Sequence, residues 1–185
     1  MPILGIMASA MSANIFQVPG SYDSLATVTV GAGGVASITF AGIPNTYKHL
    51  QIRALVRNTS TSNGYNARFN SDSGSNYARH YLIGTGSSAV AAAVTSTTSA
   101  ILNDAAISTS STGVFGASVC DILDYANTTK NKTIRTLGGF DNNGNGSIGF
   151  LSGLYMSTSA ISSILIFPDA GNFAEYSQFS LYGVR

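Results

Sequence analysis

Residues 49–57 read HLQIRALVR, a stretch in which apolar and polar side chains largely alternate. Successive side chains of a β-strand point to opposite faces of the sheet, so a period of two predicts a strand with one buried face. The residues expected on the buried face are Leu50, Ile52, Ala54 and Val56. The residues expected to face outward are His49, Gln51, Arg53, Leu55 and Arg57. The stretch therefore indicates a sheet with a core on one side.

Strand-like runs recur along the rest of the chain, separated by residues that favour turns. They are 22–30, 35–40, 65–69, 77–83, 114–125, 132–140, 147–156, 161–167 and 173–184. The first two are separated only by GAGG at 31–34, which predicts that they pair as a hairpin. The segment 84–99 has little periodicity and is interpreted as a loop with a weak strand. Since no amphipathic helix is recognisable, the pattern predicts an all-β, single-domain antiparallel β-sandwich that is jelly-roll-like.

The composition favours a β-rich protein that contacts other proteins. Charged residues account for 9% of the chain, whereas about 25% is usual in soluble proteins. Small polar residues suit turns and the outward faces of strands, while surface helices usually carry Glu, Lys and Arg. A charge-poor surface does little to repel its neighbours, so we expect contact with other protein chains.

The same composition argues against two other classes of partner. The formal net charge is +1 and no basic cluster occurs, whereas binding to a phosphate backbone relies on clustered Lys and Arg. No segment reaches about 20 consecutive apolar residues, the length that spans a bilayer. We therefore predict no nucleic-acid partner and no membrane partner.

Residues 1–16, MPILGIMASAMSANIF, are mostly apolar or small. A secretory signal begins with positive charge, but the first basic residue is Lys48, so a signal peptide is the weaker interpretation. Residues 1–20 are instead predicted to be an apolar arm or a first strand, followed by a β-sandwich domain at 21–185. Such an arm either lies on its own domain or docks on a neighbouring subunit. The predicted partner-binding residues are Ile3, Leu4, Ile6, Met7, Ile15 and Phe16.

No catalytic constellation is recognisable within one chain. Acid–base catalysis on sugars needs two carboxylates that converge roughly 5–9 Å apart. Glu175 is the only glutamate, and the spacing of Asp121 and Asp124 places them on opposite faces of a strand. Cys120 is the only cysteine, and a lone cysteine in an apolar strand is usually a small buried side chain. We therefore predict no catalytic residues, no metal site and no cofactor, with a site shared between subunits left open.

Residues 141–146, DNNGNG, match the beginning of an EF-hand calcium loop. The bidentate glutamate of such a loop belongs at the twelfth position, which here is Ser152. The flanking sequence is also strand-like, whereas the motif needs helices. Asn and Gly tolerate positive φ angles, so the stretch is interpreted as a hairpin turn.

Aromatic residues offer one further candidate site. Tyr77 and Tyr81 share a face of a predicted strand, with Arg79 between them on the same face. An exposed tyrosine offers a flat apolar ring and a hydrogen-bonding tip, which suits glycan or protein recognition. Sandwich interiors also use aromatic side chains heavily, so packing in the core is the stronger interpretation.

Five stretches carry a resemblance to known proteins. They are MPILGIMAS, YDSLATVTVGAGGVASITFAGIPNTYKHLQIRALVRN, FNSDSGSNYARHYLIGTGSS, CDILDYANTTKNKTIRTLGGFDNN and YSQFSLYGVR. Together they resemble a family of small virion proteins of tailed bacteriophages that are of β-sandwich type. The resemblance covers most of the chain, with residues 89–112 the least familiar, and it supplies no catalytic residues.

The resemblance implies a virion component in one of two roles. The first is a capsid decoration, or cement, protein, which is a homotrimer on the outer capsid surface that clamps the phage major capsid protein. The second is a distal tail-fibre or tailspike module that recognises host surface polysaccharide. A tail module usually has a long trimeric shaft or a head-binding segment, and neither is recognisable here. We therefore expect the decoration role, with residues 1–16 and one edge of the sandwich binding the shell.

Overall fold

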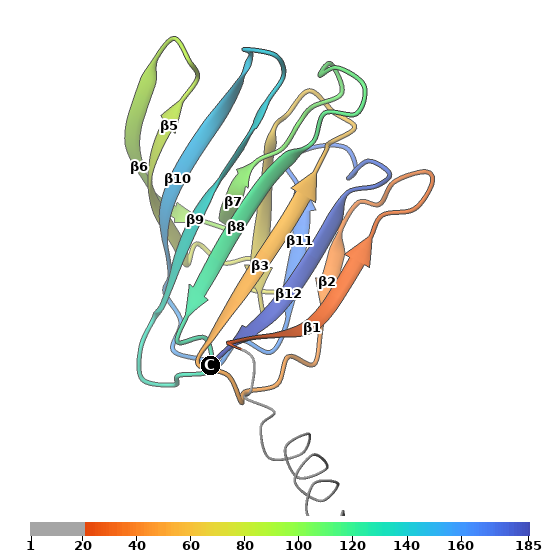
Figure 1. Ribbon diagram of the computed structural model, residues 1–185. Helices are drawn as coiled ribbons and strands as arrows, with labels where there is room; N and C mark the ends of the chain where they lie inside the picture. Colours follow the sequence, from red (N-terminus) through yellow and green to blue (C-terminus); the bar gives the residue numbers. More distant parts are fainter. Residues whose placement is uncertain (1–20) are drawn as a thin grey trace, which may run out of the picture.

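The computed structural model describes residues 21–185, which form two antiparallel sheets stacked face to face (Figure 1). The larger sheet has eight strands in the order β1-β12-β3-β8-β9-β10-β5-β6, and the smaller has four in the order β2-β11-β4-β7. The strands are β1 (Tyr22–Thr29), β2 (Ile38–Phe40), β3 (His49–Val56), β4 (Gly64–Phe69), β5 (Tyr77–Gly84), β6 (Ala89–Thr97), β7 (Ala100–Asp104), β8 (Gly116–Leu123), β9 (Lys132–Asp141), β10 (Gly146–Tyr155), β11 (Ile164–Pro168) and β12 (Gln178–Val184). The predicted all-β sandwich is confirmed.

A single core fills the space between the sheets. Its apolar residues come from alternate positions of the strands, as the period-two pattern predicts. In β3, the side chains of Leu50, Ile52, Ala54 and Val56 are all buried. Aromatic rings pack among them, and the ring of Phe179 lies 4.7 Å from that of Phe173, centroid to centroid. The buried face predicted for residues 49–57 is thus confirmed.

The hairpin predicted between 22–30 and 35–40 is wrong. β1 pairs with β12 in the larger sheet, while β2 pairs with β11 in the smaller one. The glycines between them form a corner instead of a hairpin turn, and Gly34 has a φ of 72°. A Cβ at that position would lie 2.5 Å from the carbonyl oxygen of Phe173, so only glycine fits where the chain crosses between sheets.

The middle of the chain is also more regular than the sequence indicates. Residues 89–97, interpreted as a loop with a weak strand, form the nine-residue strand β6, which pairs with β5. β6 lies at the edge of the sheet and is exposed along most of its length, so its alanines show no alternation between buried and exposed faces. The short strand β7 was not predicted at all.

One charged side chain is fully buried on the inner face of the larger sheet. The ammonium group of Lys132, at the start of β9, donates hydrogen bonds to the carbonyl oxygens of Asn127, Lys130 and Thr158. Burial lowers the pKa of this ammonium group.

Residues 21–185 contain no helix of the length and apolar character that a membrane crossing requires.

Candidate protein-binding face

The larger sheet carries apolar side chains on both of its faces. We call the face that points away from the smaller sheet the outer face, and six large apolar residues on it the apolar outer band. Each of these residues is 41% to 63% exposed. They are Leu55 on β3, Leu82 on β5, Val119 on β8, Leu137 on β9, and Ile148 and Phe150 on β10. Contiguous exposed apolar surface of this kind marks sites of interaction with other molecules.

The strand register aligns the band into two rows. Val119 pairs with Leu137, Leu137 pairs with Phe150, and Phe150 pairs with Leu82. Neighbouring strands are about 4.8 Å apart, so these four side chains form a row roughly 14 Å long. The next row along the strands contains Leu55 and Ile148. The band is therefore continuous across strands that are far apart in the sequence.

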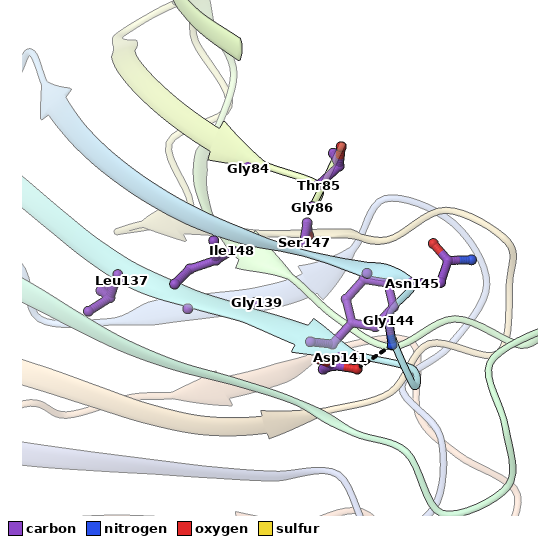
Figure 2. A pocket seen from close by; sticks show the side chains of 13 residues that line it. Gly84, Thr85, Gly86, Leu137, Gly139, Asp141, Gly144, Asn145, Ser147 and Ile148 are labelled. Carbon is purple, nitrogen blue, oxygen red and sulfur yellow. Dashed lines mark hydrogen bonds between the residues drawn. The ribbon is translucent and has the colours of Figure 1, made fainter. Parts of the chain in front are cut away.

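A hollow of about 520 Å³ lies at the end of the band, between the turn that joins β9 to β10 and the loop after β5 (Figure 2). Leu137 and Ile148 line it together with Gly139, which pairs with Ile148 across the two strands (Figure 2). Gly139 has a φ of 148°, and a Cβ there would lie 2.0 Å from the carbonyl oxygen of Ser147. No side chain fits at this position, so only glycine allows the close approach of β9 and β10 beside the hollow.

A second hollow, of about 480 Å³, lies beside the first row of the band. Leu82 and Phe150 line it together with the alanines of β6, Ala91, Ala92 and Ala93. The methyl groups of these alanines leave room that larger side chains would occupy. The band therefore combines protruding side chains with two apolar hollows. Side chains of another apolar surface can pack into such hollows and between such protrusions.

A polar row borders the band on the outer face. Gln51 donates a hydrogen bond to Asp121 at 2.8 Å, and Arg135 lies 3.3 Å from the other carboxylate oxygen of Asp121. Arg53 donates to the side-chain oxygen of Gln51, also at 2.8 Å. Its guanidinium group lies over the rings of Tyr22 and Tyr182, at 5.2 Å and 4.8 Å from their centroids. The charges of the outer face are thus partnered with one another beside the band.

The three residues predicted as a glycan or partner platform are separated by burial. Tyr77 is 1% exposed and stacks on the ring of Tyr155 in the core, with centroids 4.8 Å apart, so its ring is not available to a surface ligand. Its register with Tyr155 points it toward the smaller sheet, which is why it packs inside. Tyr81 and Arg79 are half-buried, and the Arg79 guanidinium lies 5.9 Å from the centre of the Tyr81 ring. The predicted arm residues lie outside the described residues.

The groups weighed for catalysis have structural partners. Lys130 and Lys48 lie 3.0 Å and 3.2 Å from the carboxylate of Asp124 and hold its pKa below the usual range. Cys120 is fully buried, and burial raises the pKa of its thiol to about 12.

The 141–146 stretch forms the predicted hairpin turn, in which the Gly144 amide donates to Asp141 (Figure 2). Within residues 21–185, no three His, Cys, Asp or Glu side chains gather into a possible metal site.

Sequence reasoning did not identify the band. In β9 and β10, apolar residues occur at both odd and even positions, and no charged residue follows Arg135 until Asp141. Two adjacent strands with apolar residues on both faces were the available signal, since a strand with one solvated face normally alternates.

No family model, curated protein or solved structure matches the chain.

Proposed function

We propose that this chain is a phage structural protein that decorates and reinforces the outer capsid surface as a homotrimer, bound to the major capsid protein. The observation that carries the proposal is the apolar outer band. Its six side chains are each at least 41% exposed, and nothing in the chain's own described fold covers them. A surface of this kind favours a protein that works by contact with other protein chains.

Two further observations support the proposal. Charged residues make up only 9% of the chain, so the surface has little charge to oppose close packing against a shell. The sequence stretches quoted above resemble small virion proteins of tailed bacteriophages, and these include capsid cement proteins. An all-β sandwich with one core suits a role in which the domain stays folded while its faces bind.

Copy number in purified virions is the test. Quantitative mass spectrometry of particles, with the major capsid protein as internal standard, is expected to find hundreds of copies per particle. Immunogold labelling is expected to cover the capsid rather than the tail tip. Absence of the chain from virions would overturn the proposal, and a few copies confined to the tail would overturn the decoration role.

A receptor-binding role in the tail is the second candidate, because Arg79 and Tyr81 remain partly accessible on the β5–β6 hairpin. An arginine over a tyrosine ring offers a stacking surface and donors for a sugar of the host polysaccharide. This role predicts that Tyr81→Ala reduces adsorption of phage to its host while Tyr176→Ala, at an exposed loop tyrosine, does not. Unchanged adsorption of the Tyr81 variant would exclude the platform.

A further inference from the structure

We propose that the apolar outer band binds residues 1–16 of a second copy of this chain. The inference rests on the proposed homotrimer and deepens it, because it names the two surfaces that hold the copies together. One surface belongs to the described sandwich and the other to the N-terminal segment. Among residues 21–185, nothing covers the band.

The chemistry of the two surfaces is complementary. Residues 1–22 contain no charged side chain, and the first one in the chain is Asp23. The two rows of the band likewise carry no charge from β8 to β5, and the residues between the large apolar ones are Ala117, Gly139 and Gly84. A segment whose side chains are apolar or small and uncharged loses no side-chain ion hydration when it lies on such a face. We expect the apolar side chains of Ile3, Ile6 and Met7 to enter the two hollows that adjoin the band.

The described chain begins beside the outer face of the larger sheet. β1 is the edge strand of the larger sheet, and it begins at Tyr22. The ring of Tyr22 lies against the Arg53 guanidinium on the outer face, and Arg53 pairs with Val119, the first member of the apolar row. Tyr22, close to the first described residue, therefore lies at the edge of the face that bears the band.

The length of the segment favours a second copy over its own sheet. From β1 to β5 there are six strand spacings, or about 29 Å. A fully extended segment of twenty residues spans about 66 Å, more than twice that width. Ile15 and Phe16 lie within reach of the parent sheet, but an extended segment carries Ile3 and Ile6 well beyond its edge.

Symmetry also favours this arrangement. Two copies that packed band against band would use the same surface twice, and such an isologous contact closes as a dimer. A segment of one copy on the band of the next is a heterologous contact, which joins unlike surfaces and builds a ring where the rotation between copies closes. In a three-membered ring built in this way, each N-terminal segment binds the band of the next copy, and each band is covered by one segment.

Photo-crosslinking in the full chain tests the contact directly. A benzophenone amino acid replaces Ile6, and this protein is refolded together with nitrogen-15-labelled chains that lack the probe. The expected product joins an unlabelled arm peptide to a labelled peptide containing Leu137 or Phe150. Crosslinks only within unlabelled chains, or only to peptides outside the band, would overturn the proposal.

Light scattering on full-length variants gives the second readout. The parent is expected at three times the 19.1 kDa chain mass, and Phe150→Ser and Leu137→Ser at the monomer mass with unchanged circular dichroism. Tyr176→Ser, at a residue 69% exposed but outside the band, is the matched control and stays trimeric. Band variants that stay trimeric would sink this inference alone, whereas a low copy number in virions would sink the decoration role alone. A monomeric parent would overturn both the contact and the trimer.

Discussion

The inner and outer faces of the eight-stranded sheet are built from the same strands but meet different surroundings. Leu151 on β10 points toward the smaller sheet and is 4% exposed, while its neighbour Phe150 points the other way and is 47% exposed. On the inner face, apolar side chains are covered by the four-stranded sheet. On the outer face, apolar side chains of similar size remain in solvent.

This difference separates two uses of apolar surface. Inner-face residues contribute to the free energy of folding of one chain, because they leave water when the sandwich forms. Outer-face residues of the band keep 41% to 63% of their surface in water after folding, and this remainder leaves water only when another molecule covers it. The comparison therefore predicts that substitutions on the two faces have separable effects, on stability and on assembly respectively.

The largest expected effect is on the inner face. The ring of Phe179 is fully buried and packs edge-on against Tyr65 as well as beside Phe173. Phe179→Ala is expected to lower the free energy of unfolding by about 3–5 kcal/mol, because it removes buried surface and leaves a cavity. The matched outer-face variant, Phe150→Ala, is expected to change it by less than about 1 kcal/mol.

Urea unfolding at low protein concentration measures both values without a contribution from assembly. Equal losses at the two phenylalanines would contradict the distinction between the faces. A large loss for Phe150→Ala that grows with protein concentration would instead show that folding and assembly are coupled.

The second prediction concerns the buried charge on the inner face. Lys132→Met keeps the apolar stem but removes the donor for three carbonyl oxygens, two of them 2.9 Å and 3.2 Å from the ammonium nitrogen. Leaving these oxygens without a partner is expected to cost about 1–3 kcal/mol. Lys130→Met is the control, because that side chain is 61% exposed and its ion pair with Asp124 is screened by solvent. Similar losses in the two variants, measured by thermal unfolding, would show that the buried bonds add nothing.

Much of the fold could be predicted from the sequence, because period-two alternation reports directly on strands with one buried face. It succeeded for β3, where the inner positions predicted from the alternation are all buried. It failed for β6, an exposed edge strand whose alanines do not distinguish two faces. The pairing of strands was harder, since β1 and β2 are adjacent in sequence but belong to different sheets. Only the global arrangement decides such pairings.

Most of the candidate site, the apolar outer band, could not be predicted from the sequence. Its band draws on five strands between Leu55 and Phe150, and their order in the sheet follows from long-range pairing. Alternation also could not indicate which apolar face of β9 and β10 would be covered. For Tyr77 the sequence correctly identified an aromatic on a shared face, and packing in the core was the stronger interpretation. Its burial depended on the opposing Tyr155, which is distant in sequence.

The third prediction uses the ionisable groups of the inner face. Burial raises the pKa of the Cys120 thiol from 9.0 to about 12, and it also raises the pKa of Tyr65. A group whose pKa is higher in the folded state contributes its full stability below its unfolded pKa and loses it as the pH rises above that value. For the thiol, the free energy of unfolding is therefore expected to fall by about 1.4 kcal/mol per pH unit above pH 9.

Denaturant unfolding at pH 8, 9.5 and 10.5 measures this slope. The buried tyrosines add to the decline above pH 10, and the lowered pKa of Lys132 opposes it. The difference between the parent and Cys120→Ala isolates the thiol, because the other groups are common to both. Parallel curves for the two proteins would mean that the thiol titrates alike in the folded and unfolded chains.

The smallest expected effect lies on the outer face, in the polar row beside the band. Asp121→Asn removes the charge that pairs with Arg135, whose side chain is 56% exposed, but keeps an oxygen that accepts from Gln51. The expected loss is below about 1 kcal/mol, since partly exposed ion pairs are screened. Thermal unfolding at 0.01 M and 1 M salt measures it, because the Debye length falls from about 30 Å to about 3 Å.

The difference between parent and Asp121→Asn is expected to shrink at the higher salt concentration, and the trimer is expected to persist in both proteins. Polar residues of the outer face would then act as ordinary solvated sheet surface, which leaves the apolar rows as the part that needs a partner. If the Asp121 variant dissociated instead, the polar row would belong to the contact between copies, and the binding face would extend one row further along the strands.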